Sequence, residues 1–225
     1  MTVTTTGLTR AAGLCAVVAG LIFIGVQIAH PPMQVSSVAN TEWAVRSTAK
    51  AVMAALALAG ITGMYLRQVR QLGKIGFAGY LVFATGFLLM LGTEVIAAVV
   101  LPALTRTEPG FVNDVVVAAA GGTPAGDIGQ LQTLFNLSGF AYLGGGLLFG
   151  IALFRANVLA RWAAVLLAIG AVATVALAVL PESFNRPMAI PTGVALIGLG
   201  VSLWRSLGNP ATIAAESRLE HQAAR

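Results

Sequence analysis

Long apolar runs alternate with short polar segments along the whole chain. A helix needs about 20 apolar residues to cross the hydrocarbon core of a bilayer, and six runs come close to this length or exceed it. They cover about residues 11–29, 49–66, 75–101, 131–154, 162–180 and 188–207. The pattern predicts an all-α, polytopic helix bundle with six transmembrane helices in one domain, residues 1–208, followed by a short tail, residues 209–225.

Composition agrees with a membrane location. Hydrophobic residues make up 57% of the chain and charged residues only 9%, whereas about 25% of residues are charged in an ordinary soluble domain. The mean hydropathy is +0.87. So few charged side chains cannot cover the surface of a soluble domain. We therefore expect the lipid bilayer to be the main partner of this chain.

Basic residues indicate which helix ends face the cytoplasm, because cytoplasmic loops carry an excess of Lys and Arg. With the N-terminus inside, nine of the 13 basic residues fall in inner segments and four in outer segments. We therefore expect both termini to be cytoplasmic, and we read the net charge of +5 as a topology signal and not as a nucleic-acid surface. The inner residues are Arg10, Arg67, Arg70, Lys74, Arg155, Arg161, Arg205, Arg218 and Arg225; the outer ones are Arg46, Lys50, Arg106 and Arg186.

The sequence holds no recognisable metal or cofactor motif. Its single cysteine, Cys15, lies in an apolar run, and its two histidines, His30 and His221, lie near opposite ends of the chain. Zinc sites need clustered Cys and His ligands at characteristic spacings. We therefore expect neither a metal ion nor a cofactor.

Small residues recur at four-residue spacing in three of the apolar runs, which is typical of closely packed membrane helices. We expect these positions to form the helix contacts. They are Ala12, Ala16 and Gly20; Ala51, Ala55 and Ala59; and Gly146 and Gly150.

The outer segment 102–130 contains a short apolar stretch, residues 111–120. It is too short to span a bilayer, so two interpretations stay open. It forms either an interfacial or re-entrant helix that covers the outer face, or an ordinary loop.

Glu94 is the one ionisable residue that the predicted spans place well inside the membrane. If its helix ends near Leu101, Glu94 lies seven residues, or about 10 Å at 1.5 Å per residue, below the outer surface. A carboxylate at this depth is costly unless it is protonated, paired or turned toward water. Glu94 is therefore the candidate catalytic residue, as a proton donor.

Other polar residues fall at a similar depth. Gln27 and His30 lie at the outer end of the first span, and Gln132 and Asn136 share one face of the fourth span at i and i+4. Together with Glu94 they suggest an outer-facing polar pocket that binds a ligand. The alternative is that these groups only join neighbouring helices or reach toward the interface.

Boundary motifs suggest a resemblance. Leu153-Phe154-Arg155 precedes Leu159-Ala160-Arg161-Trp162 at the fifth span, and Trp204-Arg205 ends the sixth. Over about residues 8–210 the chain resembles an uncharacterised bacterial family of six-helix integral membrane proteins, known as a domain of unknown function. The resemblance implies a bacterial inner (plasma) membrane protein, and it transfers no catalytic residue.

Three functions remain open from the sequence. The first is a non-catalytic module that binds a lipophilic ligand or a membrane partner protein. The second is an embedded acid-initiated cyclase or isomerase with Glu94 as proton donor, which resembles the small polytopic terpene cyclases in size but lacks their seventh helix and second intramembrane acid. The third is a small transporter, which the missing inverted repeat disfavours.

Overall fold

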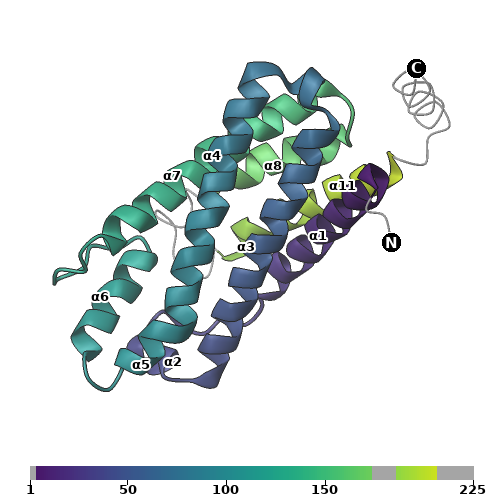
Figure 1. Ribbon diagram of the computed structural model, residues 1–225. Helices are drawn as coiled ribbons and strands as arrows, with labels where there is room; N and C mark the ends of the chain where they lie inside the picture. The colour runs from purple at the N-terminus through teal and green to yellow at the C-terminus, as the bar shows by residue number, and fades with distance from the viewer. Residues whose placement is uncertain (1–3, 174–185, 207–225) are drawn as a thin grey trace, which may run out of the picture.

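The computed structural model describes residues 4–173 and 186–206, and this part of the chain is helical without strands (Figure 1). Long helices make up most of it, and shorter ones lie between them. The long helices are α1 (Thr5–Gly25), α3 (Thr41–Arg67), α4 (Val69–Val95), α7 (Leu131–Ala156), α8 (Arg161–Ala173) and α11 (Ile190–Arg205). The shorter ones are α2 (Val35–Val38), the π-helix η1 (Ile96–Val100), α5 (Leu101–Leu104), α6 (Pro109–Ala119) and the 3-10 helix η2 (Arg186–Ala189).

Five helical segments of the described chain are long and apolar enough to cross a membrane: Thr5–Gly25, Thr41–Arg67, Val69–Leu104, Leu131–Ala156 and Pro187–Arg205. They agree with five of the predicted spans. The remaining span, 162–180, begins as α8 and is described for 13 residues, to Ala173. Residues 174–180 and the predicted tail, 209–225, lie outside the described residues, so the sixth span stays a prediction.

The long helices pack in the order of the chain. Each of them lies against the next, and α11 closes the arrangement by packing against α1 (Figure 1). Large side chains from α4, α7, α8 and α11 fill the centre and are fully buried; they include Phe83, Phe87, Phe149, Leu167 and Leu196. This arrangement fixes which helix ends lie together and therefore which polar groups meet.

Small residues form the closest helix crossings, as predicted for α1 and α7. A Cβ atom on Gly150 would lie 2.9 Å from the carbonyl oxygen of Ala164, and one on Gly146 would lie 2.7 Å from the Cβ atom of Ala171. The prediction for α3 was wrong in part. Ala51 is buried, but Ala55 and Ala59 are exposed, and the residues that face the bundle are Ala54, Ala57, Gly60 and Ile61.

The bundle has two different ends. At the basic end lie the start of α1, the turns between α3 and α4 and between α7 and α8, and the finish of α11. At the cap end, α2, α5 and α6 cover the bundle (Figure 1). The segment 111–120 is thus part of a helix, α6, and not an ordinary loop.

The cap has a small apolar core of its own. Val112, Val115 and Val116 of α6 are buried against Val38 of α2 and Leu101 of α5. The chain that follows α6 is held by Asp114, whose carboxylate accepts hydrogen bonds from the backbone N–H groups of Ala125 (3.1 Å) and Gly126 (3.0 Å). The cap is therefore a packed structure rather than a loose loop.

Candidate functional site

The candidate site lies where α3 and α4 reach the cap end. The helix that begins with α4 continues through η1 and α5 to Leu104, three residues beyond the predicted end. At 1.5 Å per residue, Glu94 lies about 30 Å along this helix from Lys74, and Lys50 lies about 26 Å along α3 from Arg67. These lengths match a hydrocarbon core of about 30 Å. Counted from the basic end, both residues thus fall near the far boundary of that core.

Glu94 forms an ion pair that the sequence analysis missed. Its Oε1 atom lies 3.7 Å from Nζ of Lys50, and about a fifth of each side chain is exposed, 20% for Glu94 and 19% for Lys50. Lys50 was counted with the outer segments, at the outer end of the predicted span 49–66, but α3 begins at Thr41 and places Lys50 more than two turns inside the helix. The spacing of Glu42, Arg46 and Lys50 at i, i+4 and i+8 was the signal for this extra helix.

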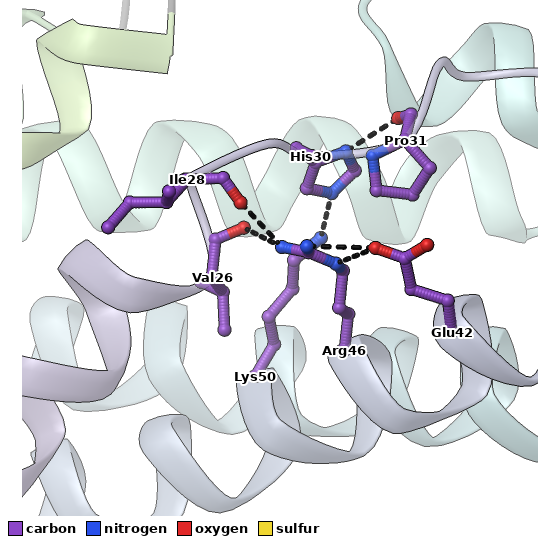
Figure 2. Close-up of polar contacts among 7 residues, drawn as sticks. All are labelled: Val26, Ile28, His30, Pro31, Glu42, Arg46 and Lys50. Atoms are coloured by element: carbon purple, nitrogen blue, oxygen red, sulfur yellow. Dashed lines mark hydrogen bonds and ion pairs between the residues drawn. The ribbon is translucent and has the colours of Figure 1, made fainter.

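His30 extends this ion pair to the segment after α1. Nζ of Lys50 lies 3.1 Å from Nε2 of His30, and Nδ1 of His30 lies 2.7 Å from the carbonyl oxygen of Pro31 (Figure 2). An ammonium group only donates hydrogen bonds, so Nε2 accepts and Nδ1 carries the proton that it donates to Pro31. With Lys50 as an ammonium, these two contacts correspond to the tautomer of His30 that carries its proton on Nδ1.

Arg46 fixes the same segment from one turn away. Its Nη1 atom donates to the carbonyl oxygens of Val26 (3.2 Å) and Ile28 (2.9 Å), and its Nη2 atom lies 2.8 Å from Oε1 of Glu42 (Figure 2). Val26 and Ile28 directly follow α1, where carbonyl groups lack helical partners and attract a cation. Arg46 thus holds the finish of α1 against α3 and helps to position His30.

Trp43 joins α3 to the π-helix that follows Glu94. Its indole Nε1 donates a hydrogen bond to the carbonyl oxygen of Ala97 at 3.0 Å, and its ring meets His30 edge-on at 6.4 Å between centroids. Single π-helical turns within α-helices are frequent at functional sites. This one begins two residues after Glu94 and lies directly against α3.

Gln132 and Asn136 form a second polar pair on α7. Nε2 of Gln132 donates to Oδ1 of Asn136 at 3.1 Å, as their i, i+4 spacing predicts. Gly79 lies opposite Leu148 and Phe149, and Gly86 lies opposite Ala141 and Tyr142. If α4 and α7 stay paired in the same way, Glu94 lies opposite about residue 134 of α7, at the same height as Gln132 and Asn136. The hydrogen bond of this pair joins two residues of α7.

The structure therefore brings together some of the predicted site residues. Glu94 and His30 meet through Lys50, and Gln27 lies between the two residues whose carbonyl groups Arg46 binds. We call His30, Lys50 and Glu94 the cap-end group. It does not suit a metal ion, because the ammonium of Lys50 lies between the two potential ligands and repels a cation.

Comparison with protein-family models, with curated proteins and with solved structures finds no match to this chain. The resemblance to a six-helix bacterial family therefore stays a prediction. Function has to be argued from the residues of the chain itself.

Proposed function

We propose that the protein is a multi-pass protein of the bacterial inner membrane, with its basic end in the cytoplasm. Five long apolar helices support the membrane location. Arginines gather at the basic end, whereas the acidic residues of the described chain, Glu42, Glu94, Glu108, Asp114 and Asp127, lie toward the cap. This distribution follows the positive-inside rule, which supports the orientation.

We further propose that the protein is a non-catalytic module that binds a lipophilic ligand with a polar head at the cap end. The observation that carries this proposal is the Lys50–Glu94 ion pair, which remains about one-fifth exposed near the hydrocarbon boundary. Charged residues in membrane helices mark binding sites and ion pathways more often than simple packing sites. A head group that both donates and accepts hydrogen bonds fits a carboxylate beside an ammonium.

The same ion pair argues against an enzyme that uses Glu94 as its acid. A proton donor must be a neutral carboxylic acid that releases its proton to the substrate. At 3.7 Å, however, the two charges of Lys50 and Glu94 stabilise each other. A group held as a carboxylate is suited to binding and not to protonating an alkene or epoxide. The embedded cyclase or isomerase is therefore the less favoured function.

Removing the ion pair tests the binding proposal. The double variant Lys50→Met/Glu94→Leu deletes both charges together, a change that proteins often tolerate when apolar side chains of similar size replace the pair. The control is Glu42→Gln, because Glu42 lies on α3 as well but its side chain is 58% exposed and pairs with Arg46 outside the cap-end group. Its amide oxygen can still accept from Arg46.

Each protein is purified in a mild detergent, extracted with organic solvent, and its co-purifying lipophilic molecules are quantified per mole of protein by mass spectrometry. We expect one amphiphile to accompany the wild type and the control, and to fall at least tenfold in the double variant. Equal amounts in all three samples would exclude a ligand site at the cap-end group. Loss of a co-purifying protein instead would identify a membrane partner and not a small molecule.

A further inference from the structure

The basic end carries a groove that is separate from the cap-end group. It runs between α1 and α11 and has a volume of about 290 Å³. Its walls are almost entirely apolar and are formed by Leu14 and Val17 on one side and Val201 on the other. This volume is near the lower end of ligand pockets, about 300 Å³, which suits one slender apolar chain.

Two glycines form the floor of the groove. A Cβ atom on Gly13 would lie 2.9 Å from the carbonyl oxygen of Gly200, and one on Gly200 would lie 2.6 Å from that of Gly13. The backbones of α1 and α11 therefore touch at this crossing, and among the described residues no side chain fills the furrow above it. The groove opens outward, where Leu14 is 52% exposed and Trp204 is 46% exposed.

Cationic and aromatic side chains border one end of the groove. Arg205 and Trp204 line it, and the guanidinium of Arg10 lies 6.0 Å from the centroid of the Trp204 ring. Both arginines are exposed. Among the residues that the structure describes, no carboxylate forms an ion pair with Arg10 or Arg205. The apolar furrow thus leads to two positive charges that form no ion pair with an acidic side chain of residues 4–173 or 186–206.

We propose that this groove binds one anionic membrane phospholipid, with an acyl chain over the Gly13–Gly200 crossing and the phosphate at Arg10 and Arg205. The groove opens on the surface that faces hydrocarbon, and its Trp and Arg residues are of the type found at head-group level. Basic sites between membrane helices bind anionic head groups. This site does not depend on the function proposed for the cap end.

A second copy of the chain fits the groove less well. Two copies in the same membrane orientation, related by a twofold axis through this face, would bring Arg10 and Arg205 of one copy toward those of the other. Like charges at such a contact repel, and no described carboxylate lies there to compensate. A lipid phosphate provides the missing negative charge and the acyl chain provides the apolar surface.

Native mass spectrometry of the purified protein tests the head-group part of the proposal. The protein is titrated with phosphatidylglycerol and, separately, with phosphatidylcholine of the same acyl chains. We expect one phosphatidylglycerol to bind the wild type in preference to phosphatidylcholine. Arg10→Gln/Arg205→Gln should weaken phosphatidylglycerol binding about 25-fold, or about fivefold per arginine, since each surface cation contributes about 1 kcal/mol toward an anionic lipid.

A matched control separates this groove from the general positive charge of the basic end. Arg155→Gln/Arg161→Gln removes two exposed arginines at the α7–α8 turn, one of which lies 4.0 Å over the ring of Phe154. We expect it to change phosphatidylglycerol affinity less than twofold. An equal loss in both double variants would overturn the proposal, as would equal wild-type affinities for the two lipids.

Filling the furrow tests the acyl-chain part. Val201→Trp and Leu14→Trp occupy opposite walls, and two variants are used so that poor folding of one does not decide the result. Each folded variant, judged by an unchanged melting temperature, should lose at least tenfold in affinity for phosphatidylglycerol. Unchanged lipid binding would overturn the proposal. So would conversion of a wild-type dimer to a monomer by Val201→Trp, measured by light scattering, because it would identify a second copy as the occupant.

Discussion

The two ends of the bundle hold their positive charges in opposite ways. At the cap end, Lys50 and Arg46 meet carboxylates, at 3.7 Å from Glu94 and 2.8 Å from Glu42. At the basic end, Arg10 and Arg161 lie over aromatic rings, and Arg67 donates to the backbone and hydroxyl oxygens of Ser206. A cation with its own carboxylate can lie near the hydrocarbon boundary, whereas one without it depends on lipid head groups or water.

The largest expected effect concerns which end faces the cytoplasm. Alkaline phosphatase is active only outside the cytoplasm, so we expect a fusion after Arg225 to be inactive and a fusion near Glu108 in the cap to be highly active. The measurement is phosphatase activity normalised to the amount of fusion protein. The reverse pattern would invert the orientation and contradict the positive-inside argument.

The next largest effect should come from breaking the cap-end ion pair on one side only. Lys50→Met leaves the carboxylate of Glu94 without its cation, and we expect a loss of about 2 kcal/mol in the free energy of unfolding, below the 3–5 for fully buried pairs because both side chains are partly exposed. The measurement is equilibrium unfolding in mixed detergent micelles. Lys50→Met/Glu94→Leu should recover most of the loss. A double variant that is as unstable as the single one would show that the loss does not come from a carboxylate left without its cation.

A smaller difference in unfolding free energy is expected between variants of the tryptophans at the two ends, Trp43 and Trp162. Trp43→Phe removes the indole donor to Ala97 and should cost about 1 kcal/mol, a typical contribution of one hydrogen bond. Trp162→Phe, at the basic end where Trp162 is 58% exposed, should cost less than about 0.5 kcal/mol. The same unfolding experiment measures both. Equal losses in the two variants would show that the hydrogen bond of Trp43 to Ala97 adds no stability beyond that of an exposed tryptophan such as Trp162.

A similarly small effect is expected for an arginine at the basic end. Arg10→Gln loses only an exposed cation–π contact, and we expect a change of about 0.5 kcal/mol in unfolding free energy in a neutral detergent. Adding anionic lipid should increase the difference between wild type and variant, since only the wild type gains the full head-group attraction. A large loss in neutral detergent would mean that Arg10 is part of the folded core.

Hydropathy predicted the long helices well, because a helix in lipid must present apolar residues over its whole length. It predicted the start of α3 poorly, since the residues from Thr41 to Thr48 mix polar and apolar side chains and resemble a loop. That error placed Lys50 next to the outer boundary of its predicted span, and its ion pair with Glu94 was not predicted. The small-residue spacing identified the buried sides of α1 and α7 but misplaced that of α3, because the neighbouring helices determine which side of a helix is buried.

Other features of the candidate site depend on contacts between distant segments. The π-helix after Glu94 is joined to Trp43, 54 residues earlier in the chain, and no local pattern encodes such a pairing. The polar pair on α7 was predictable because Gln132 and Asn136 are one helical turn apart. His30 was identified as a candidate, but its contact with Lys50 depends on how Arg46 holds the segment after α1.

The contact between α1 and α11 has a consequence for the biosynthesis of the protein. About 165 residues separate the two helices, so α1 enters the membrane well before its partner exists. At 5–20 residues per second, the ribosome needs roughly 10–30 s to produce α11. During this interval the glycine face of α1, including Gly13 and Gly20, is covered only by lipid or by other membrane proteins. A chain whose translation stops early would keep that face exposed, where membrane proteases and chaperones can recognise it.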